Sequence, residues 1–238
     1  MKKWLVLLVL VAALFGDDDF AEFDSELEIQ KISDPFSGYN KVMTNFNDDL
    51  YMNVLKPINS GYVAITHIEV RRSIDKFFKN LYYPMRFVNN IFQGKFHNAF
   101  EETGRFVVNT TVGLAGFFDP AKSEMGMLAH NEDFGQTLGF YGVGSGPHIV
   151  LPLWGPSNLR DVVSIYPNTV VSFVDYTDRD WFTLTDTWAG FLGVKAIEQV
   201  NKYSLYETTY DHIREDAIDL YPYLRELYEE KRQREIEE

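Results

Sequence analysis

The chain has 238 residues, of which 16 % are aromatic and none is cysteine, and its formal net charge is −13 at pH 7. This length suits one domain or two small ones with a buried core, while the acidic charge argues against nucleic-acid binding and against electrostatic attachment to anionic lipid. The lack of cysteine excludes thiol chemistry and disulfides, and we expect no lipid anchor.

The N-terminus has the pattern of a secretory signal. Lys2 and Lys3 precede the apolar run Trp4–Phe15, and Gly16 is followed by three aspartates. Twelve apolar residues are too few to cross a bilayer, which needs about 20 residues in a helix. We therefore expect residues 1–16 to be a signal peptide of an exported protein and residues 17–33 to be an acidic mobile leader.

A series of short amphipathic helices is predicted after residue 34. Apolar residues recur every four positions over Tyr39–Leu55, and Pro57 and Gly61 should interrupt that helix. The second helix covers 68–81, with an apolar side of Ile74, Phe77, Phe78 and Leu81 opposite a charged side that begins at Arg71. A third helix begins at Pro84 and ends at Gly94, and a fourth begins at Phe96. Their aromatic faces suit either a protein core or acyl chains.

Residues 105–161 combine glycine and proline with aromatic and aliphatic residues. Glycine allows irregular backbone and close approach, whereas large apolar side chains resist water. The stretch therefore predicts irregular backbone packed against protein or lipid. Within residues 113–116, Gly113 and Gly116 are three residues apart, a spacing of small residues at which helices can approach closely. We expect the polar group 130–133 to form a solvated turn.

The C-terminal third predicts further helices. Pro167 should split the ambiguous segment 159–174, and Asp186 can cap a helix that carries Trp188 and Phe191. Two more helices are expected over 211–220 and 222–238. The charged tail 229–238 should fray into water, which leaves 34–228 as a single, mostly α domain.

Groups for catalysis or metal binding are scarce. Ser145 lacks the glycine that a nucleophile elbow needs at position 143, and Pro147 breaks the dinucleotide pattern that Gly142 begins. The histidines show no spacing suited to a metal helix. We predict no enzyme activity and no cofactor, and a protein that binds or moves something apolar.

An ordered set of short motifs resembles the MlaA/VacJ family of outer-membrane phospholipid-transport proteins. The matching motifs are Asp34-Pro35-Phe36, Asn45-Phe46-Asn47, Leu55-Lys56-Pro57, Phe77-Phe78-Lys79-Asn80-Leu81, Phe92-Gln93-Gly94, Asn109-Thr110-Thr111-Val112-Gly113, Gly116-Phe117-Phe118-Asp119, Asp133-Phe134-Gly135-Gln136-Thr137-Leu138-Gly139, Tyr141-Gly142-Val143-Gly144, Gly146-Pro147, Gly155-Pro156 and Arg160-Asp161. They cover residues 34–161 in order, and the C-terminal third matches more loosely.

The resemblance implies a ring-like assembly of amphipathic helices in the inner leaflet of the outer membrane. Such a protein removes mislocalised phospholipid from the outer leaflet through a central channel and passes it to a periplasmic lipid carrier, which maintains lipid asymmetry. It also implies association with a trimeric porin. An envelope scaffold that holds porins or a carrier without transport is the alternative.

The resemblance also suggests site residues. Asn45, Phe46 and Asn47 are candidates for a gate, and the candidates for the channel wall are Gly139, Phe140, Tyr141, Gly142, Val143, Gly144 and Gly146. Most members of the family are lipoproteins, whereas this chain has no cysteine. We expect a protein at the periplasmic face of the outer membrane, held there without a lipid anchor and partly soluble in the periplasm.

Overall fold

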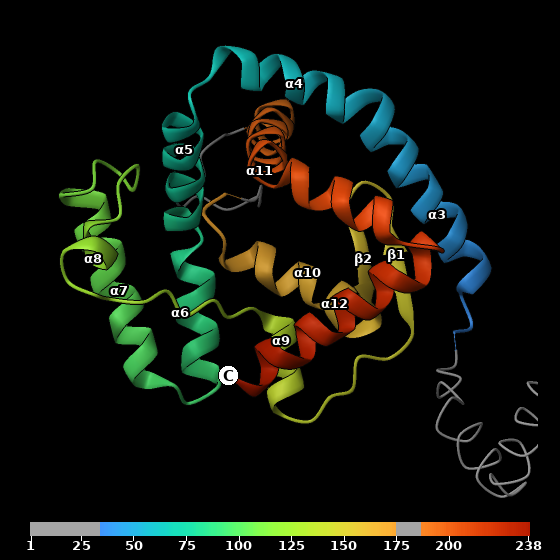
Figure 1. The fold of residues 1–238 in the computed structure, drawn as a ribbon. Helices are drawn as coiled ribbons and strands as arrows, with labels where there is room; N and C mark the ends of the chain where they lie inside the picture. Colours follow the sequence, from blue (N-terminus) through green and yellow to red (C-terminus); the bar gives the residue numbers. More distant parts are fainter. Residues whose placement is uncertain (1–33, 175–186) are drawn as a thin grey trace, which may run out of the picture. The chain divides into compact units, whose positions relative to one another are not determined.

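The computed structural model describes residues 34–174 and 187–238, and its contacts divide the chain into two units, Met1–Pro35 and Phe36–Glu238. The expected signal peptide and leader and the expected cap Asp186 lie outside the described residues. The elements of the second unit (Figure 1) are α3 (Ser37–Leu50), η1 (Tyr51–Leu55), α4 (Lys56–Ile65), α5 (Ile68–Leu81), α6 (Tyr83–Phe92), α7 (Phe96–Thr111), α8 (Pro120–Ser123), α9 (Phe134–Phe140), β1 (His148–Leu151), β2 (Gly155–Asn158), α10 (Leu159–Val171), α11 (Trp188–Asp216) and α12 (Leu220–Glu237).

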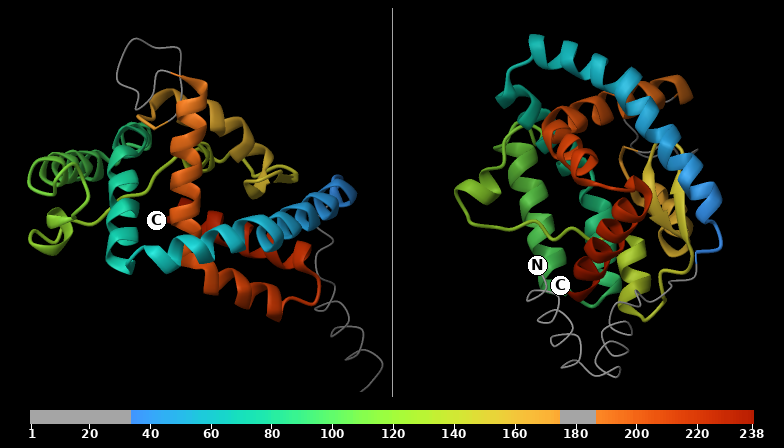
Figure 2. Two further views of the ribbon diagram at one scale, coloured as in Figure 1. Left: turned by 90° about the horizontal axis from the view of Figure 1, so that it is seen from above. Right: turned by 45° about the vertical axis from the view of Figure 1, so that its right-hand side comes forward.

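The first helix does not stop where its sequence predicts. α3, η1 and α4 form one helical run, seen as a continuous arch in Figure 2. η1 is a π-helical segment, in which the backbone N–H of Lys56 bonds to the Tyr51 carbonyl five residues back. This wider turn makes room for the ring of Pro57, so the predicted interruption is wrong there. Gly61 lies inside α4, because one glycine lowers helix stability by only about 1 kcal/mol.

The next three helices confirm their predicted positions. α5 spans the predicted residues 68–81, α6 has Pro84 in its first turn, and Gly94 follows α6 with φ of +73°. Glycine reaches that left-handed conformation without strain, which explains why α6 ends there. α7 begins at Phe96 as expected.

In α5, both the predicted apolar side and the predicted charged side contain buried residues. Phe78 and Leu81 form a small apolar cluster with Val174, as the apolar side of α5 suggests. Arg71, from the predicted charged side, is also buried and donates to the carbonyl oxygen of Ser204 at 2.7 Å. A neighbouring helix, α11, covers that side, so α5 packs through both its faces.

The glycine-rich stretch contains irregular backbone, as predicted, and also a hairpin of two short strands, which the residue pattern did not predict. Leu114, Ala115 and Gly116 have φ of 51°, 60° and 96°, so residues 113–116 form a left-handed turn and not the expected helix contact. Further on, β1 pairs with β2 in antiparallel register, His148 opposite Asn158. Strands of four residues are too short to show a clear alternation of apolar and polar residues.

The C-terminal helices are longer than predicted. Pro167 lies inside α10 and does not split it, because packing of α10 on α6, α9 and β2 outweighs the lost hydrogen bond. A separate helix over 211–220 is not present: residues 211–216 are the end of α11, and Leu220 is the first residue of α12. Thr187 caps α11, its hydroxyl oxygen accepting from Gly190 N at 3.1 Å.

The segment 229–238 is not a fraying tail. α12 continues to Glu237, and Arg232 is buried, 7 % exposed. Its guanidinium pairs with Asp133 at 2.8 Å and with Asp161 at 2.9 Å, far away in sequence. These two ion pairs hold the last turns of α12 in place.

The mostly α fold is confirmed, and the packing of its elements forms a closed circuit within the second unit. α5 packs on α6, α6 on α10, α10 on β2, and β1 on α3, whose helical run leads back through α4 to α5 (Figure 1). α11 packs on α4 and α5, and α12 packs on α3, α9 and β2. The circuit brings α3, which carries the gate candidates, to the hairpin within the glycine-rich stretch.

Candidate functional site

The surface of the described residues is rich in large apolar side chains. Phe100 is 70 % exposed, Trp154 71 % and Tyr166 75 %. Others exposed by a third or more include Val42, Phe46, Ile65, Phe92, Phe96, Val112, Phe118, Phe140, Tyr141 and Trp188. Single exposed apolar residues are ordinary, but an apolar surface as large as this one is typical of contact with another protein or with lipid.

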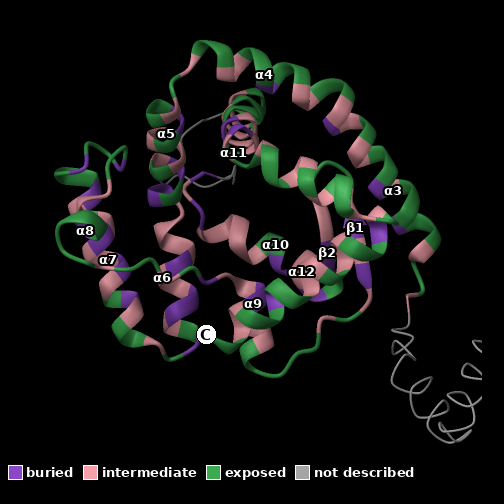
Figure 3. Ribbon diagram, viewed as in Figure 1, coloured by how far each residue is buried: buried purple, intermediate pink, exposed green. Residues whose placement is uncertain are grey.

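Polar side chains outnumber apolar ones among the buried residues. Buried positions are scattered around the helices in Figure 3 and do not form one central core. Arg86 donates to Glu102 at 2.7 Å between α6 and α7, and Thr137 Oγ1 donates to Asn89 at 2.9 Å between α9 and α6. In lipid, burying apolar side chains between helices gives little driving force for their association, and hydrogen bonds between helices contribute more. A polar interior with apolar residues on the outside is therefore the arrangement expected for a protein that lies in lipid.

Among the residues that the structure describes, no helix is both long enough and apolar enough to cross a membrane.

The three gate candidates lie in α3, and in the described part of the chain only Asn47 among them forms side-chain hydrogen bonds with the hairpin. The side-chain amide of Asn47 donates to the Leu151 carbonyl at 2.9 Å, and its oxygen accepts from Leu153 N at 2.8 Å. Phe46 is 46 % exposed, and Asn45 is exposed without a hydrogen bond among the described residues. Asn47 therefore fastens α3 to the turn between β1 and β2.

A second asparagine was missed as a candidate by the sequence analysis. Asn40 donates to the His148 carbonyl at 2.9 Å, and its side-chain oxygen accepts from Val150 N at 2.8 Å. It is seven residues before Asn47 and therefore two turns away on the same side of α3. The spacing of seven residues between the two asparagines was the available signal. Together they hold β1 along α3.

A groove of about 230 Å³ opens beside this contact. It is mainly apolar and aromatic, and its walls come from α3, η1, the hairpin, α11 and α12. The lining residues are Thr44, Asn47, Leu50, Tyr51, Leu55, Val150, Leu153, Trp154, Gly155, Pro156, Tyr203, Tyr210 and Leu224. A groove of this chemistry fits a narrow apolar chain better than a charged molecule.

The hairpin turn and the tyrosines shape this groove. Leu153 has φ of 71°, an uncommon conformation for a branched residue, which costs about 1–3 kcal/mol. The Tyr51 and Tyr210 rings meet edge to face with centroids 4.5 Å apart. Burial, followed by the negative charge of Asp211, raises the pKa of Tyr51 to about 12, so its hydroxyl stays neutral.

The channel-wall candidates 139–146 form the end of α9 and the turn after it. A Cβ on Gly139 would lie 2.5 Å from Ile236 Cδ1, so a larger residue there would displace the Ile236 side chain of α12. Gly142 and Gly146 have φ of 85° and 68°, and Arg160 donates to the Val143 carbonyl at 3.2 Å. None of the residues 139–146 lines the groove.

The group 130–133, predicted as a solvated turn, is instead packed. Glu132 is buried and accepts from Gln93 and Lys95, each at 2.7 Å. Asp133 caps α9 and pairs with Arg232. Burial opposes the charge of Asp133, but Arg232 outweighs it and holds the pKa of this carboxyl below its usual value. The sequence could not show these distant partners.

The described residues show no arrangement for covalent chemistry. Ser145 Oγ donates only to the Gly146 carbonyl, at 3.5 Å, and no described histidine hydrogen-bonds to it. No three His, Asp or Glu side chains in 34–174 and 187–238 are grouped as metal ligands.

Residues 32–235 match the model of the family described as MlaA lipoprotein. The whole chain is 27 % identical to the uncharacterized protein RP093 of Rickettsia prowazekii and spans 95 % of it. Over 136 residues the chain is 38 % identical to the "Intermembrane phospholipid transport system lipoprotein MlaA" of Escherichia coli K12; the match covers 54 % of this chain and 53 % of that protein.

A solved structure has a similar fold. It is described as "Structural basis for maintenance of bacterial outer membrane lipid asymmetry" and superposes with a TM-score of 0.72 at 26 % identity. The match covers 86 % of this chain and 99 % of that one. The names of the relatives include the word lipoprotein, which does not support our expectation of a protein held without a lipid anchor.

Proposed function

Because this chain belongs to the MlaA family, we propose that it takes part in intermembrane phospholipid transport and maintains the lipid asymmetry of a bacterial outer membrane. The family match over residues 32–235 carries the proposal. The polar interior and the apolar surface support it, because they suit a protein that lies among acyl chains.

The transport step that we propose is removal of mislocalised phospholipid from the outer leaflet. The lipid passes unchanged through a channel within the circuit of helices to a periplasmic carrier, and a trimeric porin holds the protein in place. Residues 139–146 would form part of the channel wall. The exposed aromatic faces of α3, α6 and α7 would contact acyl chains in the inner leaflet.

Asn47 is the gate residue that we favour among the three candidates. It fastens the hairpin turn, which carries the strained Leu153 and the exposed Trp154, and both line the apolar groove. Release of this contact would let the turn move away from α3 and open the groove. Asn40 would remain bonded and keep β1 as a hinge.

A gene deletion with complementation tests the function. Cells that lack the gene should expose more phospholipid at the surface, measured with a non-penetrating reagent for amino head groups, and should become sensitive to detergent. The wild-type gene should reverse both changes, and an empty vector should not. Unchanged surface phospholipid after deletion would overturn the proposal, and purified protein without bound phospholipid would favour the envelope scaffold.

A further inference from the structure

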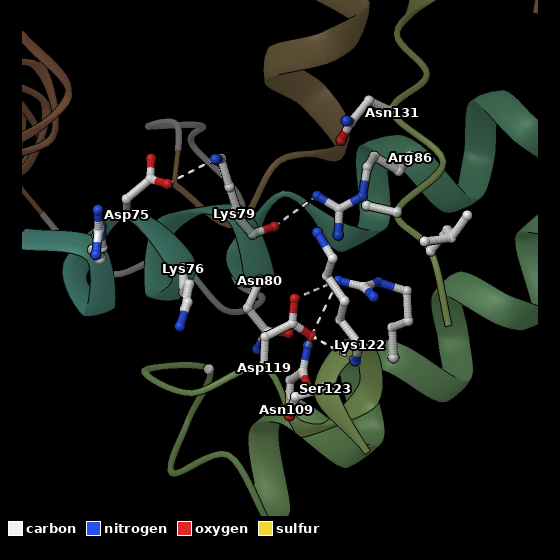
Figure 4. A pocket seen from close by; sticks show the side chains of 15 residues that line it. Asp75, Lys76, Lys79, Asn80, Arg86, Asn109, Asp119, Lys122, Ser123 and Asn131 are labelled. Atoms are coloured by element: carbon white, nitrogen blue, oxygen red, sulfur yellow. Dashed lines mark hydrogen bonds and ion pairs between the residues drawn. The ribbon is translucent and has the colours of Figure 1, made fainter. Parts of the chain in front are cut away.

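A second cavity, of about 630 Å³, lies between α5, α6 and the segment that contains α7 and α8 (Figure 4). Basic side chains dominate its wall. The basic residues are Arg72, Lys76, Lys79, Arg86, Arg105 and Lys122, and the acidic ones are Asp75 and Asp119. Such a concentration of positive charge is unexpected in a chain whose net charge is −13.

Four of the basic residues have carboxylate partners. Lys79 pairs with Asp75 at 2.7 Å and Arg105 with Asp119 at 3.0 Å. Arg72 and Arg86 each pair, also at 2.7 Å, with a glutamate that does not line the cavity. The positive charge of these four residues is therefore balanced within the protein.

Lys76 and Lys122 are not balanced in this way. Neither ammonium group has a carboxylate within 4 Å or a hydrogen-bond partner in the described parts of the chain. Lys76 extends from α5 and Lys122 from α8, and both line the same cavity (Figure 4). The cavity thus has a surplus of two positive charges.

The wall also contains a buried donor without a hydrogen bond. Arg105 is 7 % exposed, and its Nε has no hydrogen-bond partner among the described residues; Glu102 Oε1 lies 3.9 Å from it, too far for a hydrogen bond. A buried N–H without a partner costs about 1–3 kcal/mol, so a ligand oxygen that reached it would be favoured. The surplus charge and this donor both point to an anion.

We propose that this cavity binds a phosphate group, and, if the proposed function holds, that the group is the phosphodiester of a phospholipid head group. Phosphate oxygens accept charge-assisted hydrogen bonds from lysine and arginine. The volume is within the range of small-molecule sites and much larger than one phosphate ion, which leaves room for the glycerol and the head-group alcohol.

The test is a titration of the purified full chain in a phosphate-free detergent, followed by ³¹P NMR. The probes are dihexanoylphosphatidylglycerol and inorganic phosphate. We expect the lipid to bind, to bind more weakly as salt is raised, and to bind more tightly than inorganic phosphate. Equal affinity for both would retain the phosphate site but overturn the assignment to a head group, and binding of neither would overturn the whole proposal.

Matched variants locate the binding. The double variant Lys76→Gln with Lys122→Gln should weaken lipid binding about tenfold or more, whereas Lys76→Arg with Lys122→Arg should retain it. Lys231→Gln on α12, outside the cavity, is the control for loss of a lysine. A folded double glutamine variant, judged by circular dichroism, that binds like wild type would overturn the proposal.

The cellular assay separates this proposal from the proposed function. If wild type fails to restore lipid asymmetry in the deletion strain, the proposed function fails, and the titration still decides whether the cavity binds phosphate. If wild type restores asymmetry but the glutamine variant binds the lipid unchanged, only the site assignment fails.

Discussion

Replacement of Asn47 by alanine tests the contact between α3 and the hairpin turn. The change removes two hydrogen bonds, one donated to the Leu151 carbonyl and one accepted from Leu153 N. Each contributes about 0.5–1.5 kcal/mol, and the Leu153 end is exposed, so we expect a loss of about 1–2 kcal/mol in the free energy of opening the turn. That loss corresponds to about a 5–30-fold larger open population.

Hydrogen–deuterium exchange over residues 148–158 measures this opening. In Asn47→Ala, the amides of the turn should exchange about 5–30-fold faster, while those of α6 and α7 should keep their rates. Surface phospholipid should also change in cells that carry the variant, because the groove beside the turn opens more often.

The control is a second asparagine in the same helix. Asn45 is exposed and makes no hydrogen bond among the described residues, so Asn45→Ala should leave exchange at the turn unchanged. Equal exchange in Asn47→Ala and wild type would refute the reasoning. So would the same acceleration in both variants.

Three further predictions concern helix phase, close packing and buried charge. Deletion of residues 45–46 changes the phase of α3 by about 200°, so Asn40 and Asn47 cannot both hold the hairpin. We expect uncontrolled lipid flow in cells that carry this deletion. A phenotype identical to the gene deletion would count against a gate. Gly139→Val should lower the free energy of unfolding, measured by urea denaturation, by about 1–3 kcal/mol, because the new side chain would clash with Ile236. Gly144→Val is the control and should lower it less, since no atom lies within 4 Å of the new Cβ. Arg232→Met should lower the stability at pH 7 by an amount near the lower end of about 3–5 kcal/mol, since the partly buried Asp133 and Asp161 lose their partner. The folded-state pKa of Asp133 is lowered, so its contribution to stability is present above the unfolded pKa of about 3.9 and is lost as pH falls through the folded pKa. The melting temperature of the wild type should therefore fall below about pH 4, and that of the variant should fall less steeply. Parallel pH profiles of the two melting temperatures would contradict this pairing.

Neighbouring residues were enough to predict several local elements. An apolar side that begins at Ile74 and a charged opposite side located α5 to the residue. Gly94 marked the end of α6 because glycine takes its left-handed conformation without strain. The ordered motifs from residue 34 to 161 were enough to identify the family. Each of these features depends on residues that are close together in the chain.

Tertiary structure alone decided which faces are buried and which side chains meet. Periodicity shows that a helix has two different sides, but it does not show what covers either of them, and so the burial of Arg71 under α11 was not predictable. Arg232 was assigned to a fraying tail because its partners lie 99 and 71 residues away. Asn47 was found as a candidate only through the family resemblance, and its contact with the hairpin turn spans 104 residues. A buried polar group depends on a partner for its stability, and the position of that partner is set by the fold and not by the neighbouring sequence.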